Sequence, residues 1–252
     1  GTNDPWAFPG AEQFQDEYAT NSGSEGFFEK PDQWLTRLQA DVVIGFFGFN
    51  ESFQGPEKLE NFKQELEAWI LHSKAQRYNG KAAPQLALVS PIAFEDLSEI
   101  KDVPNGKLEN ENLLRYTEAM EEVAKKHQVV FVDAFTPSKS WYAASEEPLT
   151  LDGNQLNEAG YEKLAVLLAD KVFGKADQKA ISHRDIIQEA VMEKNWFWHN
   201  DYKIPNGVHV FGRRYDPFGP DNYPFELEKI RQMTAIRDTA IWEAGQGKVK
   251  DL

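Results

Sequence analysis

The sequence contains no cysteine and comparatively few basic residues. Without thiols, the chain forms no disulfide bonds, no thiolate metal site and no cysteine nucleophile, although this alone does not fix its compartment. Lysine and arginine number 27 against 41 aspartates and glutamates, which gives a formal net charge of −14. Nucleic acids and anionic membrane surfaces repel so acidic a protein, so we expect neither as a partner.

Long apolar runs are also missing. No window reaches the ~18 consecutive apolar residues of a membrane span, and the first residues resemble neither a signal peptide nor a transit peptide. The sequence begins at Gly1 instead of Met, so we expect further residues upstream in the encoded protein. The histidines and acids show no metal-ligand spacing, so we predict neither a metal nor a cofactor.

What the sequence does contain is a long apolar stretch at residues 42–53 (VVIGFFGFNESF). Its unbroken start predicts a strand buried on both faces of a parallel sheet, and open α/β sheets bind ligands at the carboxyl ends of such strands. Gly48 allows a sharp turn there, and Asn50 can offer a side-chain N–H to a developing oxyanion. The alternative is a strand that ends in a turn without chemistry.

Strand and helix patterns then alternate along the chain. A short helix at 32–38 precedes the first strand, further strands are expected at 86–92 and 129–133, and amphipathic helices at 56–78, 110–127 and 158–173. Residues 134–157 are expected to form a loop. This order predicts an α/β fold with a parallel sheet and helices on both faces.

The character of the sequence changes after Gly174. We predict an α/β domain at 1–175, beginning with an irregular loop, and a helical, aromatic-rich extension at 176–252 with helices at 178–202 and 225–244. The extension cannot bury its aromatic side chains alone, so we expect it to pack on the α/β domain. A separate module is the alternative.

Two distant segments suggest a family when taken together. Residues 48–51 (GFNE) follow a buried strand, and residues 152–155 (DGNQ) precede the helix at 158–173. This pair resembles the G-x-N-D and D-x-x-H blocks of the SGNH or GDSL hydrolases, esterases with a three-layer flavodoxin-like fold. The resemblance implies an oxyanion hole that includes Asn50 and Gly48, an orienting acid at Asp152, and Gln155 in the position of the catalytic histidine.

Four stretches resemble one particular group of SGNH domains: residues 46–53, 89–95, 156–161 and 193–196. They are similar to the SGNH domain of large exported proteins of planctomycetes and related bacteria. This likeness implies an extracytoplasmic location, a carbohydrate-ester or acyl-ester ligand, and protein partners in an assembly.

Two departures from the family pattern affect the expected chemistry. No Gly-Asp-Ser block with the nucleophile precedes residue 42, and Gln155 cannot accept and return a proton because its amide does not titrate near neutral pH. Loss of such partners costs about 10⁶ in kcat. We therefore favour a degenerate domain that binds ligand or serves a structural role. The alternative is an active ester hydrolase whose serine lies outside this chain.

Other residues could substitute for the missing groups. Gly1-Thr2-Asn3-Asp4 spells G-x-N-D, but no strand precedes it, which favours a coincidental match. Asp133 and Glu51 could line the same cleft as Asn50. Further candidates, each with a structural alternative, are the serines Ser22, Ser24 and Ser90, the histidines His72, His127, His183, His199 and His209, and the sugar-stacking aromatics Trp196, Trp198 and Tyr202.

Overall fold

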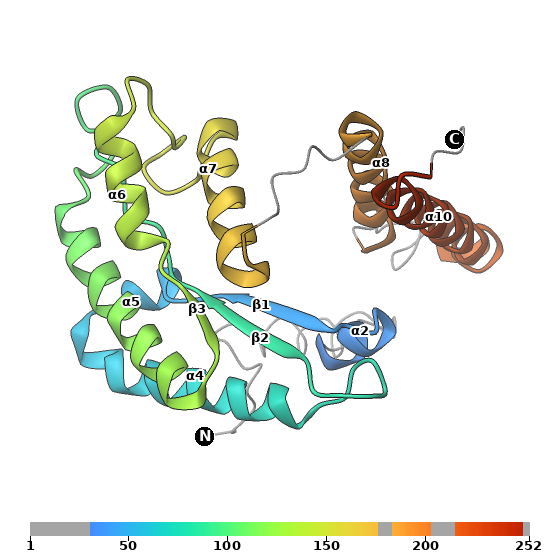
Figure 1. Ribbon diagram of the computed structural model, residues 1–252, viewed down its shortest axis with the longest axis horizontal. Helices are drawn as coiled ribbons and strands as arrows, with labels where there is room; N and C mark the ends of the chain where they lie inside the picture. The colour runs from blue at the N-terminus through green and yellow to red at the C-terminus, as the bar shows by residue number, and fades with distance from the viewer. Residues whose placement is uncertain (1–30, 176–182, 203–214, 249–252) are drawn as a thin grey trace. The chain divides into compact units, whose positions relative to one another are not determined.

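The structure is a computed structural model that describes residues 31–175, 183–202 and 215–248. These residues fall into two compact units, with 31–175 in the first and the remaining described residues in the second. Figure 1 shows the elements of both units. The predicted domain boundary after residue 175 borders undescribed residues and stays a prediction.

The first unit is built on a small parallel sheet. Its strands are β1 (Val42–Phe46), β2 (Gln85–Val89) and β3 (Val130–Val132), and they lie side by side in chain order. In the register of the sheet, Ile44 pairs with Ala87 and Leu88 pairs with Phe131. The three predicted strands and the mixed α/β class are confirmed.

Helices cover the two faces of this sheet because strand side chains alternate between them. The helices α4 (Leu59–Ala75) and α5 (Lys107–His127) pack on one face, and α7 (Glu158–Leu168) packs on the other (Figure 1). The apolar cluster between the sheet and the helices α4 and α5 contains Phe62, Leu66, Trp69, Ile70, Leu86, Leu88, Tyr116, Met120 and Val123. The apolar cluster between the sheet and α7 contains Ile44, Val89, Val132, Ala134, Leu164, Leu167 and Leu168.

Helical periodicity explains the inward face of α5. Leu113, Tyr116, Met120 and Val123 are buried, and they recur every three or four residues along the helix. A left-handed residue, Gln128 with φ of 53°, then ends α5. On the opposite face of the sheet, α7 starts at the N-cap Asn157, whose side chain accepts the backbone N–H of Gly160, and it continues as the π-helical segment η2 (Ala169–Phe173).

The burial predicted for β1 is partly wrong. Val42, Val43 and Ile44 are only half-buried, and the side chain of Phe46 is 57% exposed. The reason is position: β1 lies at one edge of the three-stranded sheet, whereas β2 lies at its centre and is buried from Leu86 onward. On the side of β1 that faces α7, Ile44 therefore packs against the helix while Phe46 stays exposed.

Two helices occur where the sequence predicts a turn and a loop. These are α3 (Phe49–Ser52) and α6 (Phe135–Ala144). Pro137 and the nearby aromatic residues favour a loop in the sequence, but Pro137 falls in the first turn of α6. The first N–H groups of a helix have no intrahelical acceptor, so proline costs no hydrogen bond there. Asp133 adds a cap, since its Oδ1 accepts the Thr136 N–H at 2.9 Å.

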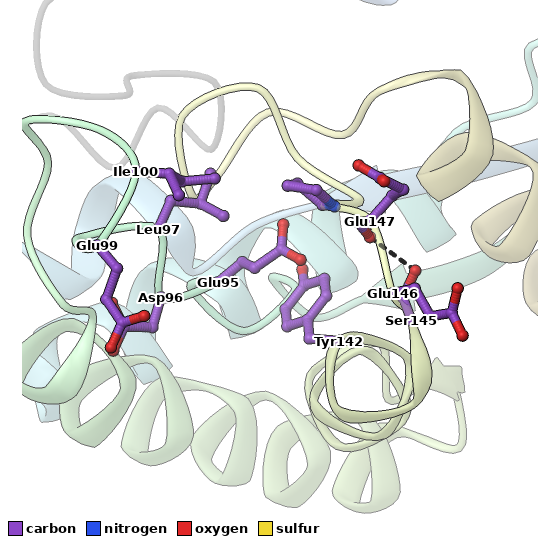
Figure 2. Close-up of a pocket in the computed structure, with 10 residues that line it drawn as sticks. Glu95, Asp96, Leu97, Glu99, Ile100, Tyr142, Ser145, Glu146 and Glu147 are labelled. Atoms are coloured by element: carbon purple, nitrogen blue, oxygen red, sulfur yellow. Dashed lines mark hydrogen bonds between the residues drawn. The ribbon is translucent and has the colours of Figure 1, made fainter.

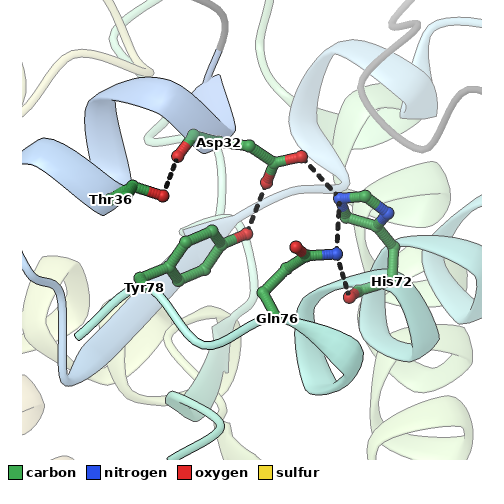
Figure 3. A network of polar contacts seen from close by, with 5 residues as sticks. All are labelled: Asp32, Thr36, His72, Gln76 and Tyr78. Atoms are coloured by element: carbon green, nitrogen blue, oxygen red, sulfur yellow. Dashed lines mark hydrogen bonds and ion pairs between the residues drawn. The ribbon is translucent and has the colours of Figure 1, made fainter. Parts of the chain in front are cut away.

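The short helix α2 (Pro31–Arg37) has no buried residue, and polar contacts hold it in place (Figure 3). Asp32 accepts a hydrogen bond from the Tyr78 hydroxyl at 2.6 Å, and its other oxygen lies 2.8 Å from Nε2 of His72. Burial, followed by the contact with Asp32, raises the pKa of Tyr78. His72 thus serves as an anchor for α2.

The second unit contains α8 (Arg184–Tyr202) and α10 (Tyr215–Gly245). Arg231 pairs with the buried Asp201 at 2.9 Å, and the guanidinium of Arg237 lies 5.0 Å from the ring centroid of Phe197. The predicted start of the last helix at residue 225 is wrong, because α10 begins ten residues earlier. Prolines and a glycine in that region favoured a later start. The packing of this unit on the α/β domain stays a prediction.

Candidate functional site

An open, mostly apolar trough of about 850 Å³ lies at the carboxyl ends of β1 and β2. It runs from the turn after β1 to one side of α7. Its apolar lining comprises Phe46, Phe47, Phe49, Val89, Pro91, Ile92, Ala134, Leu156, Leu164, Ala165 and Leu168. The polar side chains that line it belong to Asn50, Glu51, Ser90, Asn154, Gln155 and Tyr161. The structure thus brings Asn50 and Gln155, about a hundred residues apart in sequence, to one trough.

The turn after β1 depends on Gly48. Its φ is 92°, and a Cβ there would lie 3.0 Å from Sδ of Met120 and 3.2 Å from Pro91, so a larger residue would be strained. Its N–H donates to Oε2 of Glu51 at 2.9 Å. The Gly48 amide is therefore already bound, and the residue positions the turn instead of donating to an oxyanion. Asn50 is exposed, and its side chain has no hydrogen-bond partner among the described residues.

The second predicted segment forms a tight loop that ends at Gln155. An antiparallel bridge between Thr150 and Leu156 closes it. Within the loop, Oδ1 of Asp152 accepts the backbone N–H groups of Gln155 at 2.7 Å and Asn154 at 2.9 Å. Asp152 does not line the trough described above. It orders the backbone that presents the amides of Asn154 and Gln155.

These hydrogen bonds also affect the ionisation of Asp152. The N–H of Gln155, followed by that of Asn154, lowers the pKa of this carboxyl from its ordinary value of 3.8. A carboxylate whose pKa falls on folding stabilises the fold above its unfolded pKa, and the contribution is lost as the pH falls through the folded pKa. Asp152 is therefore ionised at neutral pH.

A buried carboxylate, Glu95, holds this loop from the other side. Its oxygens accept the N–H of Leu149 at 3.1 Å, the N–H of Thr150 at 2.8 Å and the Thr150 hydroxyl at 2.6 Å. The Glu95 N–H in turn donates to the carbonyl of Gly153 at 2.8 Å. Glu95 also lines an acidic pocket of about 430 Å³, which Figure 2 shows beside Tyr142. With its oxygens bonded in this way, Glu95 fixes the position of the loop.

Ser90 lines the trough but is bound within the protein. It is 3% exposed, its hydroxyl donates to the Pro91 carbonyl at 3.0 Å, and its oxygen accepts the N–H of Ala134 at 2.9 Å and of Phe135 at 3.2 Å. Because the oxygen faces these donors, it is poorly placed to attack a ligand. Ser90 joins the segment after β2 to the start of α6.

We expect Ser90→Ala to lower the free energy of unfolding by about 1–3 kcal/mol, because two buried N–H groups lose their acceptor. Urea denaturation followed by circular dichroism measures the change. The exposed Ser140 provides the matched control, since Ser140→Ala should alter stability by less than about 0.5 kcal/mol. Equal stability of the two variants would contradict the structural role of Ser90.

None of the remaining catalytic or binding residues predicted from the sequence is found in the described lining of the trough. Like His72, His127 contacts a carboxylate, since its Nε2 lies 2.7 Å from Oε1 of Glu67, and neither histidine lines the trough. His183, His199, Trp196 and Trp198 lie in the second unit and stay predictions. Those outside the described residues are Ser22, Ser24, His209 and the segment 1–4. Tyr202 ends α8, and its side chain is not described. Within the described residues, no group of three or more acids and histidines could hold a metal ion.

Two acids, Glu95 and Glu51, hold backbone N–H groups in the structure, and the sequence does not predict these roles. Glu95 carries no local signal of its role, because its partners are more than 50 residues away. Glu51 had been noted only as a possible cleft residue. Its spacing of three residues from Gly48 is the spacing of a capping box, and this could have indicated the bond to the Gly48 N–H.

Comparison with known proteins gives a limited likeness. No family model matches the sequence. No curated protein matches it either. Among solved structures, the chain is similar to the lipase/acylhydrolase from Enterococcus faecalis, with 21% sequence identity and a TM-score of 0.40. The match covers 56% of this chain and 65% of that chain, which is less than two thirds of the enzyme's length. None of the described helices is long and apolar enough to cross a membrane.

Proposed function

We propose that this chain carries an SGNH-like domain that binds an ester-like ligand in the trough without hydrolysing it. The ligand enters beside Asn50 and Gln155 and lies along α7. In this proposal the domain is a degenerate relative of the SGNH hydrolases, and it acts as a binding module of a larger protein or assembly.

One observation carries the proposal: the described lining of the trough lacks the pair of a free serine and a histidine base on which the SGNH hydrolases depend. It contains no histidine, cysteine, lysine or aspartate, and the oxygen of its one serine, Ser90, accepts two backbone N–H groups. By the sequence resemblance, Gln155 stands in the position of the base, and its amide does not titrate. Hydroxyl nucleophiles need an adjacent base to react, so a ligand in this trough would stay intact.

The finer fold assignment belongs to the same proposal. The contacts of α4 and α5 with one face of the sheet and of α7 with the other support the proposal of a three-layer, flavodoxin-like arrangement. The parallel order β1-β2-β3 also suits such a fold. From the sequence resemblance alone, we further propose that the protein works outside the cytoplasm, as a domain of a large exported protein of the kind found in planctomycetes and related bacteria.

A paired assay tests the proposed function. The protein is incubated with p-nitrophenyl esters of increasing chain length and, separately, with a fluorophosphonate probe that labels activated serines. We expect hydrolysis at the buffer rate, no labelled peptide by mass spectrometry, and saturable binding of the ester by calorimetry. An active serine esterase serves as the positive control for both reagents.

Two results would contradict binding without turnover. Covalent labelling of any serine would show an activated nucleophile and would favour the alternative, an ester hydrolase completed by residues outside this chain. Failure of every ester to bind would instead remove the role of the trough as a ligand site.

A further inference from the structure

We infer that the trough accepts an unbranched apolar chain with an uncharged polar head, and that Glu51 excludes carboxylates from the head position. This inference rests on the proposed function and deepens it, because it names the ligand class of the same site. It also separates the two sides of an ester cleavage: the intact ester or amide would be bound, whereas the free acid would not.

The shape and lining of the trough indicate the chain. Along α7 the lining side chains are those of Tyr161, Leu164, Ala165 and Leu168, which recur at helical spacing on one side of the helix. Seven residues of helix extend about 10 Å, enough for an unbranched chain of several methylene groups. The rest of the lining includes Val89 and other apolar residues, which offer a sugar few hydrogen-bond partners. A sugar buried there would leave hydroxyl groups unpaired, so an alkyl or acyl chain fits better.

The polar residues of the trough indicate the head group. Asn50, Asn154 and Gln155 line it, and no hydrogen bond of their side-chain amides is found within the described part of the chain. Each amide offers two N–H donors and one carbonyl acceptor, which together match an ester, an amide or a hydroxyl group. No lysine, arginine or histidine belongs to the described lining, so a carboxylate would find no cation there.

The negative charge of Glu51 also disfavours a ligand carboxylate at the head position. Glu51 is a lining residue of the trough, next to Asn50 in the chain, and its carboxylate accepts the Gly48 N–H at 2.9 Å. A second carboxylate close beside it would be repelled by its charge. The rest of the chain does not offset this repulsion, because the formal net charge is −14. The amino end of α3, which would attract an anion, is already occupied by Glu51.

Three probes of equal chain length test the head-group selectivity. Octanamide, octanoate and octylammonium are titrated into the full chain at pH 7, and calorimetry gives the Kd of each. We expect octanamide to bind at least about tenfold more tightly than octanoate, because the carboxylate of octanoate would lie near the Glu51 charge with no cation to pair with it. Octylammonium should bind no more tightly than octanamide, since the amides at the head position offer a neutral group both donors and acceptors.

The variant Glu51→Gln identifies the residue responsible. Its side-chain carbonyl can still accept the Gly48 N–H, but its charge is gone, so we expect the ratio of the octanoate and octanamide Kd values to fall to about threefold or less. Glu121→Gln is the matched control, since it removes the same charge from an exposed position outside the trough lining. Its ratio should equal that of the native protein.

Each possible failure has a distinct meaning. Equal binding of octanoate and octanamide to the native protein, an unchanged ratio in Glu51→Gln, or tighter binding of octylammonium would each overturn the head-group inference. Binding of sugar esters without binding of any octyl compound would overturn the assignment of the chain while the proposed function stands. Ester turnover by the native protein would overturn the proposed function and leave the measured selectivity unaffected.

Discussion

Replacement of Glu95 by alanine should lower the free energy of unfolding by about 3–5 kcal/mol, because it removes the acceptor of several buried donors at once. The N–H groups of Leu149 and Thr150 and the Thr150 hydroxyl all donate to this carboxylate. Each would be left buried without its partner, and the lost side chain would leave a cavity. Chemical denaturation with urea measures the change.

Two further variants separate this effect from the loss of charge or surface area. Glu95→Gln keeps one oxygen acceptor and loses the other, so its destabilisation should fall between that of the native protein and Glu95→Ala. Glu99→Ala removes an exposed carboxylate from the same acidic pocket and should change stability by less than about 0.5 kcal/mol. If Glu95→Ala were as mild as Glu99→Ala, the buried hydrogen bonds would not be holding the loop.

The contacts of Glu95 are of a kind that the sequence does not predict. Apolar runs and helical periodicity predict β2 and α5, because burial of one face leaves a pattern within a single element. The bonds of Glu95 to the loop that starts near Leu149 join segments more than 50 residues apart, and neither segment carries a pattern that reveals the other. The exposure of Phe46 was missed for a similar reason, because the position of β1 at the sheet edge depends on the whole sheet.

Of the four predicted site residues, Asn50 and Gln155 line the trough, whereas Gly48 and Asp152 do not. The apolar run at 42–53 placed Asn50 after a strand of a parallel sheet, and the family resemblance placed Gln155 in the same site; both line one trough. The role of Gly48 differs from the prediction, since its N–H is bound to Glu51. Asp152 was expected to orient the side chain at position 155, and its Oδ1 contacts that residue through the backbone N–H, as it also does Asn154. Such local bonds compete with the roles that a family pattern implies.

The substitution Ala165→Trp should block the trough and weaken octanamide binding by about 10- to 100-fold, because a large indole would occupy the space of the ligand chain. Ala165 lines the trough from an exposed position on α7, so the larger side chain replaces no buried contact and the helix should stay folded. Calorimetric titration measures the loss of affinity, and circular dichroism confirms that folding is unchanged.

The adjacent position provides the matched control for this variant. Val166 is 64% exposed and does not line the trough, so Val166→Trp adds a bulky side chain to the same helix without entering the ligand space. Its octanamide affinity should stay within about twofold of the native value. Because both variants carry an exposed tryptophan on α7, any difference between them reports the trough itself. Equal affinities would place the ligand elsewhere on the molecule.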